Sequence, residues 1–371
     1  MIKVQFFRTS RFGAARATVL WLGVSLAATA GVGAETVARP GQSTAQATSS
    51  TPTAAAAKRG TRTKASGAAK ARARVARIRA ARRANSARAL AEASTPRYRT
   101  DETGNVVPDI RAAAAIIYDP ATGKVLWEEN SQDERSIASI TKVMTAIVFL
   151  ESATDLDQEV VITRADTLHA STTYLRTNDR IRLHDLLHLL LLPSDNAAAR
   201  ALARISPLGY DGFIARMNQK AEDLGLDHTA YVDPSGLFSD NISSAYDMAR
   251  LIAFAGEDDR IGPIMRTPEY AFRTSGPKAG RIITVHSTNQ ILRAGAGDVE
   301  VRGGKTGFIS KAGYCLATLL KLPQGGPSLA VVVLGANSNL GRFWETRHLL
   351  SWLSARTQLL GLAAPAVSAT K

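Results

Sequence analysis

The chain has a single cysteine, Cys315, and therefore cannot form an internal disulfide. Exported proteins without disulfides depend on their hydrophobic core for stability, and a hydrophobic content of 45% is enough for such a core. Cys315 lies in an apolar stretch typical of a strand. We therefore expect a buried, inert thiol and not a nucleophile.

Long apolar runs are also absent beyond the first 34 residues. The N-terminal segment combines basic residues, an apolar run at 17–30 and small residues up to Ala34, which is typical of a secretory signal peptide over 1–34. The run is shorter than the roughly 20 residues that span a bilayer. We expect cleavage after Ala34 and an exported protein, in the periplasm or at the outer face of the cytoplasmic membrane, either soluble or loosely membrane-associated.

Large apolar residues are scarce between residue 35 and about residue 100, where Ala, Ser, Thr, Pro, Lys and Arg dominate. Such a segment cannot bury enough apolar surface to fold alone. We expect 35–106 to be a disordered cationic linker, with transient helix over 68–93, where Ala and Arg are abundant. The arginines fall on every helical face, so no amphipathic stripe is predicted.

The net charge of +14 is concentrated in this linker. Residues 51–100 hold 14 basic and 1 acidic residue, whereas residues 101–371 hold 27 basic and 30 acidic residues. Export disfavours nucleic acid as a partner. Residues 58–99 are then a solvated tether or, as the alternative, a segment that contacts an anionic surface of the cell envelope, because basic residues near such a surface are attracted to it.

From residue 107 onward the sequence predicts a folded domain that extends to residue 362, followed by a tail at 363–371. Apolar runs at 112–118 and 124–128 flank a turn with Pro and Gly, which predicts a hairpin. The expected helices are 140–150, 183–192, 197–203, 212–224, 245–254 and 342–359, and the later strands are 281–286, 302–306, 313–321 and 328–334. Strands at both ends with helices between them indicate an α+β fold: an antiparallel sheet flanked by helices, with an all-helical subregion.

A serine and a lysine three residues apart, Ser139 and Lys142, lie in a helical pattern. Residues at this spacing share one helix face, so the amine can reach the hydroxyl. A lysine activates a serine nucleophile only when burial or a nearby positive charge lowers its pKa. On its own the pair is weak evidence, because many such pairs are ordinary surface residues.

Two other polar patterns strengthen the interpretation of Ser139 and Lys142 as a catalytic pair. Ser-Asp-Asn begins at Ser194, between two apolar helical stretches, where it either caps the next helix or faces a cleft. Lys-Thr-Gly begins at Lys305, after two glycines in a strand pattern. That second pattern is either a kinked edge strand or a place where a ligand approaches the backbone and its anion meets the lysine and threonine.

The order S-x-x-K, S-D-N, K-T-G resembles that of the penicillin-recognising serine enzymes, the penicillin-binding proteins and the class A β-lactamases. The stretches 303–308, 312–315 and 233–237 look like those of the D-alanyl-D-alanine peptidases of low molecular mass. The resemblance covers about 107–360 and implies a β-lactamase/transpeptidase-like fold. Since no second β-domain or amphipathic anchor follows, it favours the small soluble endopeptidase branch over the carboxypeptidases.

The resemblance also implies roles for individual residues. Ser139 would attack the carbonyl between two D-alanines, Lys142 would take its proton, and Ser194 would relay a proton to the leaving amine. The backbone N–H groups of Ser139 and Phe308 would form the oxyanion hole, Asn196 would hold the substrate amide and Lys142, and Lys305 and Thr306 would bind the terminal carboxylate. The implied substrate-binding set is Asn196, Lys305, Thr306, Gly307 and Phe308. Peptidoglycan stem peptides would be substrates and β-lactams covalent inhibitors, with no cofactor or metal.

A class A-like β-lactamase is the nearest alternative, because Ser-Asp-Asn is also the second motif of those enzymes. They use a glutamate to activate the deacylating water. No Glu-x-x-Leu-Asn sequence occurs between Ser194 and Lys305. We therefore expect slow deacylation of penicillin.

Two hypotheses belong to other classes. His184 and His188 stand one helical turn apart, as in zinc peptidases with H-E-x-x-H. Asp185 replaces the glutamate and no third ligand is evident, so exposed helix histidines are the preferred interpretation. The other hypothesis is a cationic, non-catalytic wall-binding protein, which predicts that Ser139→Ala leaves all activity unchanged.

Overall fold

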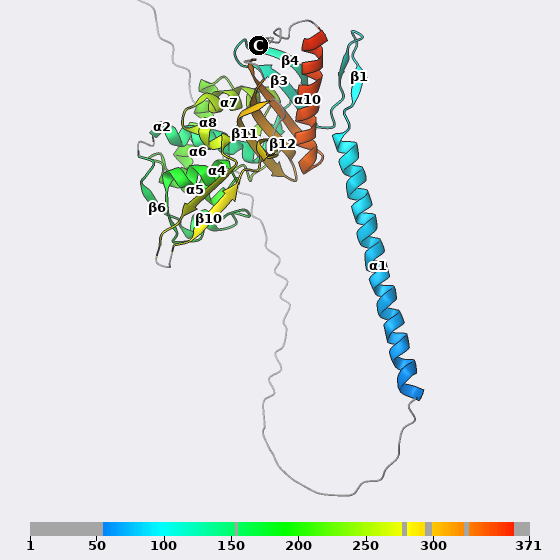
Figure 1. The fold of residues 1–371 in the computed structure, drawn as a ribbon. Coiled ribbons are helices and arrows are strands. Elements are labelled where there is room, and N and C mark those ends of the chain that lie inside the picture. Colours follow the sequence, from blue (N-terminus) through cyan, green and yellow to red (C-terminus); the bar gives the residue numbers. More distant parts are fainter. Residues whose placement is uncertain (1–54, 153–154, 277–279, 294–298, 323–325, 360–371) are drawn as a thin grey trace, which may run out of the picture. The chain divides into compact units, whose positions relative to one another are not determined.

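The computed structural model describes residues 55–152, 155–276, 280–293, 299–322 and 326–359 (Figure 1). The signal peptide expected at 1–34 and the tail expected at 363–371 lie outside these ranges. Among the described helices, none has both the length and the apolar character needed to cross a bilayer. By its contacts the chain divides into two units, Met1–Ala71 and Arg72–Lys371.

In chain order, the first elements are α1 (Ala55–Ser94), β1 (Tyr98–Thr100), β2 (Val106–Pro108), β3 (Ala114–Asp119), β4 (Lys124–Glu129), β5 (Arg135–Ser136), the short 3₁₀ helix η1 (Ala138–Ile140) and α2 (Thr141–Ser152). The next are β6 (Glu159–Val161), α3 (Arg164–Thr167), β7 (Arg180–Arg182), α4 (Leu183–Leu191), α5 (Asn196–Ile205), α6 (Gly209–Asp223), β8 (Ile242–Ser243), α7 (Ala245–Glu257) and α8 (Ile261–Arg266). The last are β9 (Glu269–Arg273), β10 (Ile282–His286), α9 (Gln290–Arg293), β11 (Glu300–Ile309), β12 (Gly313–Lys321), β13 (Ser328–Ala336) and α10 (Asn339–Leu359).

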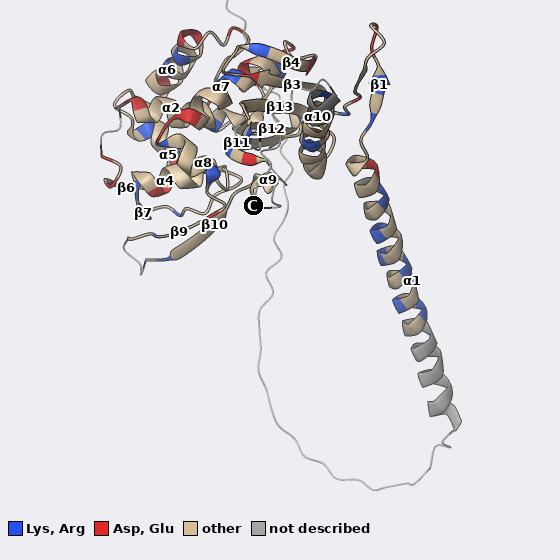
Figure 2. Cartoon of the chain, turned by 45° about the horizontal axis from the view of Figure 1, so that its top comes forward, with Lys and Arg blue, Asp and Glu red and all other residues tan. Residues whose placement is uncertain are grey.

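The segment expected to be a disordered linker differs from that expectation in two ways. It contains the 40-residue helix α1, which begins before the predicted 68–93 stretch; Ala, Arg and Lys all have high helix propensity. Its arginines from Arg72 to Arg88 are exposed, and the basic positions (blue in Figure 2) recur along the helix. In addition, β1 pairs with β2 and so precedes Val107, the expected start of the folded region. All three residues of β1 are exposed, so no apolar pattern marks this strand in the sequence.

A five-stranded antiparallel sheet forms the centre of the domain, in the order β11-β12-β13-β3-β4. Alternate residues of a strand point to opposite faces. In β13, Val331 and Val333 join the cluster beneath α10, whereas Val332 and Leu334 join the larger cluster that includes α2 and α7. The sheet is therefore covered on both faces, as Figure 1 shows.

The expected α+β architecture, with an antiparallel sheet and a helical subregion, is confirmed. Each predicted helix or strand corresponds to a structural element. The elements not predicted are short: β1, β2, β5, β6, β7, β8 and β9, with η1, α3, α8 and α9. Such segments of two to six residues carry too few apolar positions for a periodic pattern. Cys315 is fully buried in β12, and burial raises the pKa of its thiol to about 11, as expected of an inert cysteine.

Candidate active site

The nucleophile candidate Ser139 lies in η1, directly before α2, so it does not share one α-helix with Lys142 as the spacing of the pair suggests. Its Oγ is 2.9 Å from the Nζ atom of Lys142 in the first turn of α2. The preceding residue, Ala138, has φ of 49°. A left-handed backbone is uncommon for a residue other than glycine, and such strain is often found at functional sites. The bend leaves Ser139 partly exposed while Lys142 is fully buried.

Lys142 is held by three acceptors, two of them from distant parts of the chain. Its Nζ donates to Ser139 Oγ, to Asn196 Oδ1 at 2.7 Å and to the backbone oxygen of Ser235. Burial lowers the pKa of Lys142 to about 7, against the opposing effect of the carboxylates of Asp233 and Asp195. A substantial fraction of the amine is therefore neutral near pH 7, and a neutral amine can accept the proton of Ser139.

The loop that carries Ser235 is organised by Asp233, which is buried. One carboxylate oxygen accepts hydrogen bonds from the N–H and O–H of Ser235 and from the N–H of Gly236. The other accepts from the backbone of residues 237 and 238. Gly236 has φ of 76°, and a Cβ there would stand 2.0 Å from the carbonyl oxygen of Ala138. Only glycine lets this loop press against the nucleophile turn.

On the opposite side of Ser139, the second and third motifs meet. Lys305 Nζ donates to Ser194 Oγ at 2.8 Å and to the backbone oxygen of Thr306 at 2.9 Å. Ser194 itself has φ of 67°, a second left-handed residue. Burial, and next the positive charges of Lys142 and Arg342, hold the pKa of Lys305 well below its usual value. A negative charge on a bound ligand would act in the opposite direction, because an opposite charge nearby favours the cationic form of an amine.

Both interpretations of Ser-Asp-Asn are correct, but for different residues. Asp195 is a helix cap: it accepts from the N–H of Ala198 at 3.0 Å and from the N–H of Tyr174 at 2.6 Å. Asn196 instead faces the site, where its Oδ1 binds Lys142 and its Nδ2 donates to the backbone oxygen of Ala170 at 2.7 Å. The amide orientation is thus defined at both ends.

Strand β11 brings the third motif against the nucleophile. A Cβ on Gly307 would stand 2.6 Å from the backbone oxygen of Ile137 and 3.2 Å from the N atom of Ser139. The Thr306 hydroxyl donates to the hydroxyl of Thr288 at 2.7 Å. Phe308, the next residue of β11, is 49% exposed.

The predicted site residues Ser139, Lys142, Ser194, Asn196, Lys305, Thr306, Gly307 and Phe308 therefore come together around one centre. Sequence reasoning missed the carbonyl of Ser235 and the clamp formed by Arg342. Arg342 is buried, and its Nη1 donates to the backbone oxygens of Gly307 at 2.9 Å and Cys315 at 3.2 Å. Burial lowers its pKa to about 10. An Asp-Pro-x-Gly sequence predicts the turn that carries Ser235. No sequence pattern predicts that Arg342 contacts the third motif.

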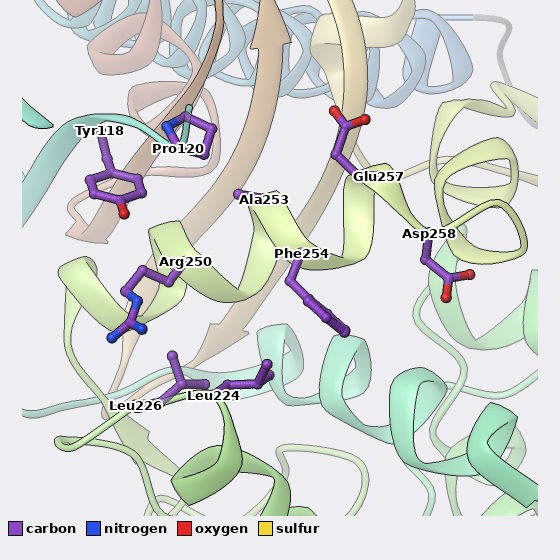
Figure 3. Close-up of a pocket in the computed structure, with 9 residues that line it drawn as sticks. All are labelled: Tyr118, Pro120, Leu224, Leu226, Arg250, Ala253, Phe254, Glu257 and Asp258. Atoms are coloured by element: carbon purple, nitrogen blue, oxygen red, sulfur yellow. The ribbon is translucent and has the colours of Figure 1, made fainter. Parts of the chain in front are cut away.

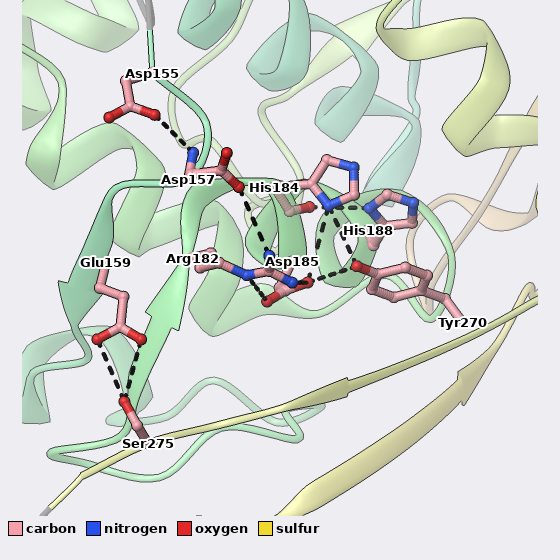
Figure 4. Close-up of polar contacts among 9 residues, drawn as sticks. All are labelled: Asp155, Asp157, Glu159, Arg182, His184, Asp185, His188, Tyr270 and Ser275. Carbon is pink, nitrogen blue, oxygen red and sulfur yellow. Dashed lines mark hydrogen bonds and ion pairs between the residues drawn. The ribbon is translucent and has the colours of Figure 1, made fainter.

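The histidine pair of α4 lies in a separate packing cluster (Figure 4). The ring of His188 stacks on Tyr270 with centroids 3.8 Å apart, and its Nδ1 lies 2.9 Å from the backbone oxygen of His184. The Asp185 carboxylate accepts from Tyr270 Oη at 2.6 Å and from Arg182. Within the described ranges no group of three or more His, Cys, Asp or Glu side chains could hold a metal ion.

A cavity of about 530 Å³ lies beside α7, and none of the motif residues lines it. Figure 3 shows the Arg250 guanidinium at one end and the Glu257 and Asp258 carboxylates at the other. The lining residues are Tyr118, Pro120, Leu224, Leu226, Arg250, Ala253, Phe254, Glu257 and Asp258. This cavity is distinct from the group of motif residues around Ser139.

Comparison with known proteins agrees with this geometry. A family model described as D-alanyl-D-alanine carboxypeptidase matches residues 101–338. A D-alanyl-D-alanine endopeptidase of Escherichia coli is 32% identical over 248 residues, which are 66% of this chain and 78% of that protein. One of Pseudomonas aeruginosa is 33% identical over 249 residues, with the same coverage. The crystal structure of the Streptomyces K15 DD-transpeptidase superimposes with a TM-score of 0.62 at 28% identity, covering 67% of this chain and 98% of that one.

Proposed function

Because the chain belongs to the D-alanyl-D-alanine carboxypeptidase family, whose members are serine peptidases, we propose that it hydrolyses peptidoglycan peptides through an acyl-enzyme on Ser139. The observation that carries this proposal is the position of Lys142. Its amine lies 2.9 Å from the Ser139 hydroxyl, and its pKa is lowered to about 7. A base with a pKa near the working pH is the most effective proton acceptor.

In the first half-reaction, the Ser139 hydroxyl gives its proton to Lys142 and Oγ attacks the carbonyl carbon of the penultimate D-alanine. The N–H groups of Ser139 and Phe308 donate to the oxyanion, and the loss of one such donor typically costs about 3 kcal/mol. The carbon–nitrogen bond then breaks. The proton passes from Lys142 through Ser194 to the leaving amine, and an ester on Ser139 remains.

In the second half-reaction, water attacks the ester and gives a proton to Lys142. Collapse of the intermediate releases the peptide carboxylic acid and returns the proton to Ser139 Oγ. Asn196 keeps Lys142 in position throughout, because its Oδ1 is 2.7 Å from Nζ. Lys305 and Thr306 bind the carboxylate of the leaving residue, whose negative charge favours the cationic form of Lys305 and so opposes the lowering of its pKa by burial.

We favour endopeptidase action on cross-links, with carboxypeptidase action as the second candidate. The two endopeptidase relatives described above match this chain over 78% of their own length. A carboxypeptidase of Bacillus subtilis matches at 29% identity over 61% of its length. The family model itself is described as a carboxypeptidase. Measuring hydrolysis of cross-linked and of monomeric peptides would therefore distinguish the two activities.

Rapid β-lactam hydrolysis does not fit this site. The Asp-Pro-Ser-Gly stretch is the one expected in place of a deacylating glutamate, and its Asp233 carboxylate accepts five hydrogen bonds from its own loop. These bonds occupy both oxygens of the carboxylate, so we expect Asp233 to hold the loop and not to activate a water. Penicillin should therefore remain on Ser139 for a long time.

The proposal includes a location and a second partner. A peptidase of cell-wall peptides must reach its substrate outside the cytoplasm, in the periplasm or at the outer face of the cytoplasmic membrane. Helix α1 carries Arg72, Arg74, Arg77, Arg79, Arg82, Arg83 and Arg88, all of them exposed. With Glu92 as the single acid of α1, this surface suits an anionic polymer or lipid surface of the envelope.

The test is the intact mass of the protein after several hours with excess penicillin. The parent protein should carry one drug molecule, and Ser139→Ala should carry none. Ser136→Ala is a matched control, because Ser136 is buried three residues away and its hydroxyl has no hydrogen-bond partner among the described residues. It should acylate like the parent.

Two other outcomes would contradict the proposal. Unmodified parent protein with intact penicillin would favour the cationic, non-catalytic wall-binding protein. Unmodified protein with consumed penicillin would favour the β-lactamase.

A further inference from the structure

Two aromatic rings next to the Lys-Thr-Gly motif have no assigned function. Phe308 directly follows the Lys-Thr-Gly motif and is 49% exposed, although it is a large apolar residue. Its ring stacks on the half-buried ring of Tyr314, with centroids 4.2 Å apart and an interplanar angle of 26°. Phe308 and Tyr314 are direct cross-strand partners in β11 and β12. We call this ring pair the aromatic wall.

The aromatic wall is rigid, because one buried side chain holds both of its strands. Arg342 donates to Gly307 O in β11 and to Cys315 O in β12, the neighbours of the two aromatic residues. Its guanidinium also lies 5.6 Å from the centre of the Tyr314 ring, within cation–π range. A surface that is fixed before binding loses little entropy when a ligand covers it.

The Phe308 ring of the aromatic wall lies on the same face of β11 as Thr306, one of the two residues proposed to bind the substrate carboxylate. Side chains alternate along β11, so Thr306 and Phe308 lie on one face, and Gly307 lies on the other, against the nucleophile turn. Two residues along a strand span about 6.6 Å. A group bound at the Thr306 hydroxyl is therefore within one side-chain length of the Phe308 ring.

The configuration of the leaving residue, L or D, determines whether its side chain lies on the Thr306 and Phe308 face of β11. With the scissile carbonyl at the N–H groups of Ser139 and Phe308, a peptide paired antiparallel to β11 places its leaving residue opposite Gly307. An L residue there would direct its side chain to the face of Gly307. A D residue directs it to the other face, which is the face of Thr306 and Phe308.

We propose that the Phe308–Tyr314 wall is a specificity element that binds the aliphatic side chain of a D-configured diamino acid, the leaving residue of a cross-linked stem peptide. This inference rests on the proposed function. A terminal D-alanine presents only a methyl group at this position, whereas the cross-linked residue presents a chain of methylenes that can cover the ring. The wall thus selects cross-links over free peptide termini.

The experiment compares kcat/KM for a purified cross-linked muropeptide dimer and for a monomeric pentapeptide that ends in D-Ala-D-Ala. Phe308→Ala should lower the dimer-to-monomer ratio of kcat/KM about tenfold, the effect expected for lost methylene contacts. Phe308→Tyr should restore the ratio, because it keeps the ring. Tyr314→Leu should lower the ratio less than Phe308→Ala, and it tests the wall independently should Phe308→Ala fail to fold.

Phe254→Ala is the matched control, because Phe254 is a similarly exposed phenylalanine on α7, 44% exposed, outside the cleft. It should leave the ratio unchanged. The penicillin acylation rate of each variant corrects for any disturbance of the Phe308 N–H, which affects both substrates equally. If Phe308→Ala leaves the dimer-to-monomer ratio of kcat/KM unchanged, the aromatic wall is not a specificity element. Acylation of the parent protein would still support the proposed function in that case. A parent protein without acylation would instead remove the proposed function itself.

Discussion

The positive charges of this protein fall into two groups in opposite environments. Lys142 and Lys305 are buried in the cleft, where each amine makes more than one hydrogen bond, and their pKa values are lowered. The described arginines of α1 are all exposed, and the structure gives them no ion-pair partner among its described residues (Figure 2). Within the first group, Lys142 has a pKa of about 7 and can therefore gain or lose a proton near neutral pH. The second group can only attract negative charge.

The comparison also shows why net charge is a poor guide to this protein's chemistry. The excess of basic residues lies before residue 101, whereas the part that contains the cleft holds nearly equal numbers of basic and acidic residues. Two lysines in a low-dielectric cleft matter more for catalysis than many arginines in water, because burial, not number, lowers the pKa of an amine. Exchanging or removing members of each group tests this difference.

Replacement of the buried base should have the largest effect. Lys142→Met removes the proton acceptor of Ser139, and we expect the rate of penicillin acylation to fall about 10³-fold. The rate is measured by intact mass over time. Lys124→Met on β4, an exposed lysine, is the matched control and should acylate like the parent. A Lys142→Met variant that is folded and acylates within tenfold of the parent would contradict the assigned role.

The pH dependence should follow the same group. Below a pKa of about 7, Lys142 is protonated and cannot accept the Ser139 proton, so the acylation rate should rise with pH and level off above this value. Stopped mixtures analysed by mass at pH 5.5 to 8.5 give the profile. A rate that falls with rising pH, or stays constant across the range, would show that the neutral amine is not the reactive form.

Loosening the loop behind the buried base should have an intermediate effect. Asp233→Asn replaces one acceptor oxygen with a donor, although both oxygens accept hydrogen bonds in the structure. We expect the free energy of unfolding to fall by about 2 to 3 kcal/mol and acylation to slow, because Ser235 no longer holds Lys142. Denaturant unfolding measures the first effect. Asp240→Asn, at an exposed site of the same loop, should change neither quantity.

Removal of the exposed group should have the smallest effect on catalysis. We expect replacement of the seven α1 arginines from Arg72 to Arg88 by Gln to leave the acylation rate unchanged. Binding to anionic polymer or anionic vesicles should weaken, and its dependence on salt should become less steep, because fewer counterions are released. Gln at Ala73, Ala76, Ala80 and Ala84 controls for changes in the helix. Equal binding by both variants would contradict an electrostatic role for α1.

Much of the fold could be predicted because its elements are long and periodic. The helix at 183–192 has apolar residues at helical spacing and corresponds to α4, and the strands at 313–321 and 328–334 correspond to β12 and β13. Strand β1 could not be predicted, since all its residues are exposed and its pairing depends on β2. Helix α1 exceeds its predicted length, since strong helix formers dominate between Ala55 and Ser94 and no proline interrupts them.

By itself the sequence determined the identity and order of the three motifs, and thereby the candidate nucleophile, base and anion-binding residues. Only the tertiary structure decided what those residues can do. The lowered pKa of Lys142 requires burial and partners 54 and 93 residues away, and the contact between Lys305 and Ser194 joins residues 111 apart. Arg342 and Ser235 contact the motif residues in the same way, through packing between distant segments. A sequence pattern records which groups are present, but the pKa of a group and the shape of a cleft depend on packing between segments that are neighbours only in space.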